Sequence, residues 1–164
     1  MILRRATSKD LEAVFRMHSR SITAACKGYY SDEQIASWTG VLAPEIYESA
    51  LHEKVFLVAQ CGKGRIHGMG ILDCENCEVS AVYICPESLG KHVGSGILQE
   101  LENIAKDSNI SMLTVHSTLN AKEFYKRKGY AEKKSMYHEL PNGLRLECIE
   151  MVKEFRKSQD ALAG

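Results

Sequence analysis

The spacing of apolar residues along the chain alternates between the periods of strands and of helices. Short runs of apolar, β-branched and aromatic residues predict strands, and these runs lie at residues 2–4, 55–61, 66–73, 79–85, 112–116, 130–140 and 144–152. Apolar residues that recur every three or four positions predict helices, and these segments lie at residues 11–28, 31–38, 44–51, 97–107 and 118–128. The resulting order, with strands and helices interspersed, indicates a mixed α+β fold.

Several of these segments carry residues that start or end a helix. Ser31 and Gln34 form the Ser-x-x-Gln pattern of a capping box, in which each side chain bonds to the backbone of the other residue. Pro44 stands at a favoured first helical position, and Gly129 stands where glycine commonly ends a helix. Pro141-Asn142-Gly143 predicts a tight turn between the last two strands.

Length and composition limit the domain organisation and the class of partner. The 164 residues suit one domain, which we expect at residues 1–155, followed by a polar C-terminal tail at 156–164. Lysine plus arginine equals aspartate plus glutamate, 21 each, which argues against nucleic acid or an anionic membrane as partner because both require a basic surface. No apolar run approaches the length of a membrane span, and the N-terminus lacks the order of a signal peptide. With six scattered cysteines expected as reduced thiols, these features predict a cytoplasmic protein.

The stretch from Val82 to Leu98, VYICPESLGKHVGSGIL, contains the most informative pattern in the chain. An apolar strand ends at Pro86, because proline cannot donate to a sheet ladder. Three glycines follow: Gly90, Gly94 and Gly96. Helical spacing begins at Ile97, and the loop before it lets backbone N–H groups approach an anion closely. Together with the free N–H groups and positive dipole end of the helix, this predicts a phosphate cradle built mostly from backbone.

This cradle matches neither a Walker A loop nor a dinucleotide fingerprint, because the lysine of the first and the glycine spacing of the second are missing. It resembles the coenzyme A pyrophosphate loop of the GNAT superfamily of N-acetyltransferases, Q/R-x-x-G-x-G/A after a strand ending in V-x-P. Leu89 stands where Gln or Arg is usual, and His92 stands where the first Gly is usual. A strand–helix connection with packing glycines is the alternative interpretation of this segment alone.

A second segment strengthens the resemblance. LTVHSTLNAKEFYKRKGY is similar to the late strand–helix–strand motif of the family, N-x-x-A-x-x-F-Y-x-x-x-G-F/Y. Thr118 replaces the usual Asn and is expected to cap the helix. The matching residues are Ala121, Phe124, Tyr125, Gly129 and Tyr130. The resemblance covers about residues 3–152. Within the family, the chain resembles a bacterial branch of uncharacterised acetyltransferases. The resemblance implies a central, mostly antiparallel sheet of about seven strands flanked by helices.

The resemblance implies that acetyl-CoA is the cosubstrate and that no metal is involved. It implies transfer of the acetyl group to a primary amine by direct attack in a ternary complex. We expect a small-molecule acceptor, and the sequence leaves open whether it is a small amine, a polyamine, an antibiotic, an amino acid or instead a protein N-terminus. We expect a monomer or homodimer. The cofactor-binding residues it implies are Tyr83, Ile84, Leu89, Gly90, Lys91, His92, Val93, Gly94, Ser95, Gly96 and Thr118.

The same resemblance suggests catalytic roles. The backbone amide of Ile84 or Tyr83 would polarise the thioester carbonyl. Tyr125 occupies the position of a tyrosine that protonates the departing sulfur; packing beside Phe124 is the alternative role.

The general base and the acceptor site are less clearly marked. Glu78 is the best-placed base by sequence, with Asp73 and Glu75 as alternatives. One wall of the acceptor cleft would carry aromatic residues that could also belong to the core: Tyr29, Tyr30 and Trp38.

Two other functional classes fit parts of the sequence. A catalytically silent module that binds or senses coenzyme A would explain the departures at Leu89 and His92. Cys74 and Cys77 form a C-x-x-C motif, but a zinc site needs a second ligand pair. A redox site would normally place this motif at a helix N-terminus, whereas here it falls at a predicted hairpin turn.

Overall fold

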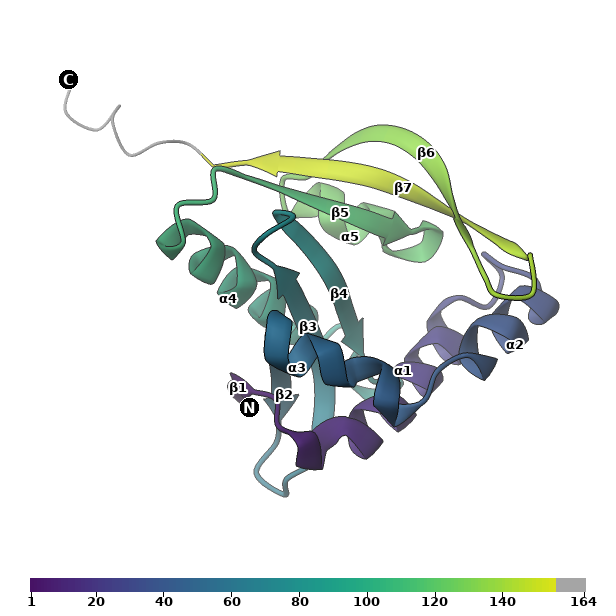
Figure 1. The fold of residues 1–164 in the computed structure, drawn as a ribbon, viewed down its shortest axis with the longest axis horizontal. Helices are drawn as coiled ribbons and strands as arrows, with labels where there is room; N and C mark the ends of the chain where they lie inside the picture. The colour runs from purple at the N-terminus through teal and green to yellow at the C-terminus, as the bar shows by residue number, and fades with distance from the viewer. Residues whose placement is uncertain (156–164) are drawn as a thin grey trace.

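The computed structural model describes residues 1–155, which form one seven-stranded sheet with helices on both faces (Figure 1). The predicted polar tail, 156–164, lies outside the described residues. The strands are β1 (Ile2–Arg5), β2 (Val55–Gln60), β3 (Ile66–Asp73), β4 (Glu78–Ile84), β5 (Met112–Thr118), β6 (Ala131–Glu139) and β7 (Arg145–Glu154). The α-helices are α1 (Leu11–Ala25), α2 (Asp32–Gly40), α3 (Glu48–Glu53), α4 (Val93–Asp107) and α5 (Lys122–Arg127). Both the mixed fold and the mostly antiparallel sheet are as the sequence predicts.

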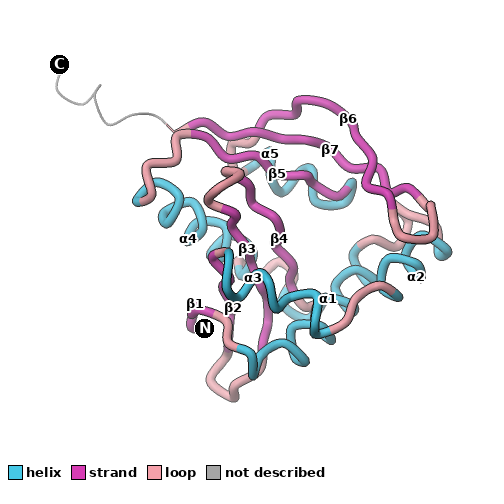
Figure 2. Tube along the Cα trace, in the orientation of Figure 1, coloured by secondary structure: helices cyan, strands magenta, loops and turns pink. Residues whose placement is uncertain are grey.

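The sheet has the strand order β1-β2-β3-β4-β5-β7-β6. All neighbouring strands are antiparallel except β4 and β5. This parallel pair is held by only two register positions, Glu78 with Thr114 and Val79 with Val115. Beyond them β4 and β5 diverge, and Figure 2 shows β5 running across the start of β4 rather than alongside the whole strand.

A bulge lies at the point where the two strands diverge. Leu72 of β3 pairs with Val79, and the adjacent Ile71 pairs with Ala81. Ser80 is therefore an extra residue in β4. Because a bulge bends the strand that carries it, Ser80 helps to turn the rest of β4 away from β5.

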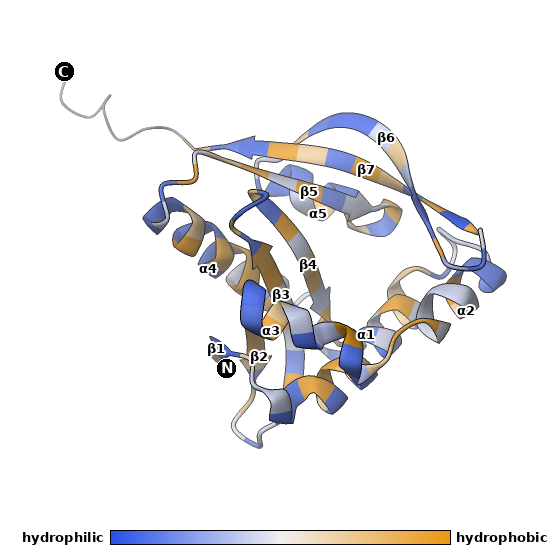
Figure 3. Cartoon of the chain, in the orientation of Figure 1, coloured by the Kyte–Doolittle hydropathy of each residue, from blue (hydrophilic) through white to orange (hydrophobic). Residues whose placement is uncertain are grey.

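The core is divided between the two faces of the sheet. Helix α4 packs its buried residues, such as Leu98 and Leu101, against one face. Helices α1 and α3 cover the other face around Phe56 and Met69. Figure 3 shows the apolar residues of β2 and β3 between these layers, whereas β6 at the sheet edge is largely hydrophilic.

The structure confirms some predicted helix ends and corrects others. The Ser31–Gln34 capping box forms in both directions, and Gly129 has a φ of +89° after α5. Helix α4 begins at Val93 rather than at Ile97, because the small residues of its first turn interrupt the apolar period without interrupting the helix.

The expected cap at Thr118 is wrong. Within residues 1–155 its side chain makes no capping hydrogen bond, and a 3-10 turn at residues 119–121 precedes α5. The hydroxyl of Tyr30 instead accepts a hydrogen bond from the backbone N–H of Leu119 at 3.0 Å. A side chain distant in sequence has replaced the local cap.

Candidate active site

A pocket of about 490 Å³ opens where β4 and β5 diverge. Its walls come from α1, the end of β4, the loop into α4, the first turn of α4 and the segment from Thr118 to Lys128. The predicted cofactor-binding residues that line it are Tyr83, Ile84, Leu89, Gly90, His92, Val93, Gly94, Ser95 and Thr118. Lys91 and Gly96, also predicted, are not part of the lining.

The start of α4 gives this pocket a set of free backbone donors. His92 precedes the helix in the left-handed conformation, with φ 60° and ψ 10°. The first intrahelical hydrogen bond runs from the N–H of Gly96 to the carbonyl of His92 at 3.0 Å, which leaves the N–H groups of Val93, Gly94 and Ser95 available. The free N–H groups at this pocket therefore belong to the first turn of the helix, which begins closer to the strand than the apolar spacing indicated.

The two glycines of this turn face different surroundings. A Cβ on Gly94 would lie 3.4 Å from Cγ1 of Ile84 and 3.6 Å from Cζ of Phe124, both in the pocket wall. A Cβ on Gly96 would meet only Cε of Met1, at 3.7 Å. A side chain added at Gly94 would therefore lie against the pocket wall, whereas one added at Gly96 would lie away from it.

Positive charge at the pocket comes from a place that the sequence analysis did not single out. Arg127 and Lys128, at the end of α5, both line the pocket, whereas the predicted Lys91 does not. The one signal in the sequence is that these two basic residues lie just after the Phe-Tyr motif on the helix predicted to border the cofactor. They place two cations in the same pocket as the free amides of α4.

The backbone of β4 contributes a further donor. The N–H of Cys85 donates to the carbonyl of His67 on β3, at 2.8 Å. Because successive residues of a strand direct their N–H groups to opposite edges, the N–H of Ile84 points away from β3 and into the pocket. The N–H of Tyr83 points back toward β3. Of the two amides predicted to polarise the thioester, the geometry thus favours that of Ile84.

Tyr125 lies at the junction of this pocket and a smaller one. The second hollow, of about 30 Å³, lies directly between β4 and β5 and shares Tyr83, Thr118 and Tyr125 with the first. Tyr125 is 4% exposed, and its hydroxyl makes no hydrogen bond to any described residue. Burial raises its pKa above the usual range of tyrosine, so the phenol stays protonated and able to donate.

The three aromatic residues predicted for the acceptor wall lie in different environments in the structure. Tyr30 belongs to the core: it is buried, and its hydroxyl donates to the carbonyl of Glu147 at 2.6 Å. Tyr29 is 56% exposed. Trp38 is half-buried and packs edge-on against Tyr83, with ring centroids 6.5 Å apart. None of the three predicted aromatic residues lines either pocket. Each contacts a residue that does: Trp38 packs on Tyr83, and the backbone N–H groups of Tyr29 and Tyr30 donate to the carbonyl of Cys26.

His18 of α1 packs against Tyr83. Their ring centroids are 3.9 Å apart, and Nδ1 of His18 lies 2.8 Å from the hydroxyl of Tyr47. Burial lowers the pKa of His18 to about 3, so the imidazole is neutral near neutral pH.

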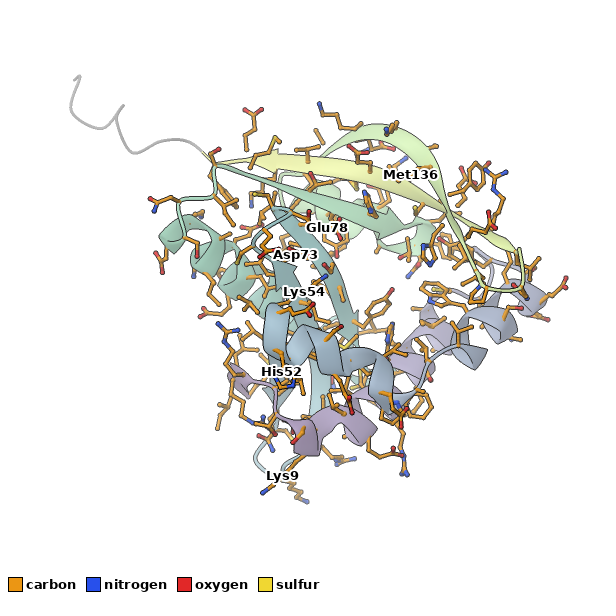
Figure 4. The ribbon with its side chains drawn as sticks, in the orientation of Figure 1. Lys9, His52, Lys54, Asp73, Glu78 and Met136 are labelled. Carbon is orange, nitrogen blue, oxygen red and sulfur yellow. The ribbon has the colours of Figure 1, made fainter. Side chains whose placement is uncertain are left out.

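Glu78 is not part of either pocket lining. It lies at the start of β4, close to Asp73 at the end of β3 (Figure 4). Ile84 lies six positions further along the strand, a distance of about 20 Å at ~3.3 Å per residue. The structure therefore does not bring Glu78 together with the phosphate cradle.

Cys74 and Cys77 occupy the turn between β3 and β4, as predicted. Both are free thiols, and the Sγ of Cys77 lies 3.7 Å from the carbonyl of Cys74. Nowhere in residues 1–155 do three His, Cys, Asp or Glu side chains gather in a way that could hold a metal ion. In the same residues no helix is long and apolar enough to cross a membrane.

Comparisons with known proteins agree with this architecture. The family model described as acetyltransferase (GNAT) domain matches residues 26–154. An uncharacterised N-acetyltransferase of Methanocaldococcus jannaschii is 27% identical over 160 residues, covering 94% of this chain and 92% of that protein.

Solved structures give the same result. A GCN5-related N-acetyltransferase from Rhodopseudomonas palustris has a TM-score of 0.88 at 25% identity, covering 94% of this chain and 95% of that one. The PaiA N-acetyltransferase of Thermoplasma acidophilum, solved in complex with coenzyme A, has the same fold, with a TM-score of 0.74 at 22% identity and coverage of 94% and 98%.

The protein belongs to the GNAT acetyltransferase family. It is an acyl-CoA-dependent acetyltransferase.

Proposed function

We propose that the protein transfers the acetyl group of acetyl-CoA to the primary amine of a small molecule, by direct attack in a ternary complex. One observation carries the proposal: the free amides of α4, the outward amide of Ile84 and the hydroxyl of Tyr125 all border one pocket. Bound acetyl-CoA would supply an activated thioester; everything else is done by the residues of the chain.

The cradle and its charges bind the phosphates. The N–H groups of Val93, Gly94 and Ser95 donate to the pyrophosphate, and the positive dipole end of the 15-residue helix α4 adds to their effect. Arg127 and Lys128 neutralise phosphate charge from the opposite wall. The residue type at His92 matters less than its left-handed backbone, which directs the following amides toward the pocket.

The end of β4 and the start of α5 act on the thioester. The N–H of Ile84 donates to the carbonyl oxygen and stabilises negative charge as it develops there. The hydroxyl of Tyr125 donates its proton to the sulfur as the thiolate leaves. Tyr125 suits this role because its proton is not committed to any described residue.

Binding can be tested without knowing the acceptor. Coenzyme A at ~100 times its dissociation constant should stabilise the folded protein by about 2.7 kcal/mol, which a thermal melt would detect as a higher Tm. A melting temperature unmoved by millimolar acetyl-CoA would contradict the proposal.

Turnover identifies the acceptor class. A panel of primary amines, including polyamines, amino acids and peptide N-termini, is incubated with the protein and acetyl-CoA. Free thiol and acetylated amine should appear in equal amounts, measured by thiol reagent and by mass spectrometry. Coenzyme A binding without amine-dependent thiol release would favour the silent binding module instead.

A further inference from the structure

The small hollow between β4 and β5 carries polar groups that the functions assigned above do not use. Besides Tyr125, it is lined by Ser80, the bulged residue of β4, and by His116 of β5. Its volume of about 30 Å³ exceeds the roughly 10–15 Å³ that a cavity needs to hold one water molecule. It lies next to the place where the proposed function puts the thioester, because Tyr83, Thr118 and Tyr125 line both hollows.

His116 is held by a carboxylate on the neighbouring strand. Its Nδ1 lies 3.8 Å from Oε2 of Glu78, a distance within ion-pair range but longer than a hydrogen bond. The side chains are 40% and 31% exposed, so both remain accessible to solvent and to a ligand. With Nδ1 facing the carboxylate, Nε2 is the ring nitrogen left to receive a proton from the substrate.

Other charged groups face the same part of the sheet. Glu150 of β7 is the register partner of His116, and Lys134 of β6 is the register partner of Glu150, with the ammonium 3.7 Å from its carboxylate. Glu150 is thus paired with a cation. Glu78, whose described ionic contact is with His116, is the carboxylate that acts on the imidazole.

We infer that His116 is the general base of the reaction and that Glu78 is a positioning residue that acts through it. This inference rests on the proposed function. Glu78, which the sequence favoured as the base itself, lies outside both hollows, whereas His116 lines the one beside Tyr125.

The proton balance of the reaction fits these positions. The acceptor enters as an ammonium ion and loses one proton, through the water that the hollow can hold, to Nε2 of His116. The amine lone pair then forms the C–N bond while the C–S bond breaks. The thiolate takes the proton of Tyr125, and Tyr125 regains a proton from the nitrogen, which loses it as the amide forms. The proton on His116 returns to solvent.

The test is the pH dependence of kcat/KM for the best amine of the panel, in wild type and in His116→Gln. General bases contribute about 10²–10⁴-fold, so the substitution should lower kcat/KM at pH 7 by about 10²-fold. It should also flatten the acidic side of the pH profile relative to wild type. The affinity for acetyl-CoA and the Tm should change little, because the side chain is partly exposed.

Two further variants make the result specific. Glu78→Gln should alter the pH profile, because it removes the carboxylate that faces Nδ1 of His116, and it should lower kcat/KM less than His116→Gln does. His52→Gln is the matched control: His52 is exposed on α3, away from β5 (Figure 4), and its loss should leave the profile unchanged.

The outcomes separate the two proposals. If wild type transfers acetyl groups but His116→Gln keeps its rate and its acidic limb, the assignment of His116 is overturned and the proposed function stands. If wild type releases no thiol with any amine, the proposed function fails, and the inference falls with it.

Discussion

The two sides of the gap between β4 and β5 are built in different ways. On the cofactor side, the donors are consecutive backbone N–H groups of Val93, Gly94 and Ser95 at the start of one helix. On the other side, His116 comes from β5 and Glu78 from the far end of β4, and they meet only because the sheet places them side by side. The first site is local in sequence and the second depends on tertiary structure.

This difference has consequences for substitution. A backbone cradle depends on conformation and on free space, so it should be sensitive to added volume and insensitive to the charge of its side chains. A site made of side chains should respond to the loss of single functional groups while the fold and the bound cofactor stay unchanged. The following predictions test this contrast.

The largest effect is expected at Gly94. Gly94→Val would add two methyl groups beyond a Cβ that already makes van der Waals contact with Ile84 and Phe124, at 3.4 and 3.6 Å. We expect the affinity for coenzyme A, measured by isothermal titration calorimetry, to fall at least ~100-fold, or about 2.8 kcal/mol. Gly96→Ala, two residues further along the same turn, should leave it unchanged. Equal losses in both variants would indicate damage to the helix rather than a blocked pocket.

The next effect concerns a single hydroxyl. Tyr125→Phe removes a group with no described hydrogen-bond partner, so the Tm and the affinity for acetyl-CoA should stay close to wild type while kcat falls at least about tenfold. Tyr130→Phe is the converse: its hydroxyl donates to Glu102 at 3.1 Å, and its loss should cost about 1 kcal/mol of stability without changing kcat. An unchanged kcat in Tyr125→Phe, with chemistry rate-limiting, would remove Tyr125 from the mechanism.

A smaller effect distinguishes the basic residues. Arg127 and Lys128 line the pocket and Lys91 does not. Alanine at both Arg127 and Lys128 should weaken coenzyme A binding by roughly threefold to tenfold, about 0.7–1.4 kcal/mol, and by less at high salt. Lys91→Ala should change it by less than about twofold. A larger loss for Lys91→Ala would place the phosphates on the loop instead of beside α5.

The smallest effect is expected at His92. Its φ of 60° is strained for a non-glycine residue, by roughly 1 kcal/mol, so His92→Gly should keep or slightly improve coenzyme A binding in the same titration. A loss of more than about tenfold would mean that the imidazole itself contacts the ligand.

The sequence predicted the features that depend on local residues better than the features that depend on tertiary contacts. The strand–glycine–helix order at residues 82–98 and the cap at Gly129 are local signals, and the structure confirms them. The apolar spacing predicted the start of α4 at Ile97, whereas the helix begins at Val93. The glycine and serine residues of the first turn continue the helix but contribute no apolar side chains to the pattern. Thr118 does not cap α5, because the hydroxyl of Tyr30 reaches the Leu119 amide from 89 residues away.

The candidate site was only partly predictable for the same reason. Leu89 to Ser95 could be placed by motif, but the choice of the Ile84 amide over that of Tyr83 required the hydrogen bond between Cys85 and His67. Nothing in the local sequence around His116 indicates that it approaches Glu78. That contact depends on the parallel register of β4 and β5, which no single segment encodes.

The central claim is that the pocket between β4 and β5 binds acetyl-CoA with its pyrophosphate on the first turn of α4 and its thioester beside Tyr125. A crystal structure of the protein with acetyl-CoA tests it most directly. The account predicts phosphate oxygens within hydrogen-bond distance of the N–H groups of Val93, Gly94 and Ser95, the thioester carbonyl on the N–H of Ile84, and the sulfur within reach of the Tyr125 hydroxyl. A pyrophosphate bound away from α4, or a sulfur that Tyr125 does not contact, would contradict it.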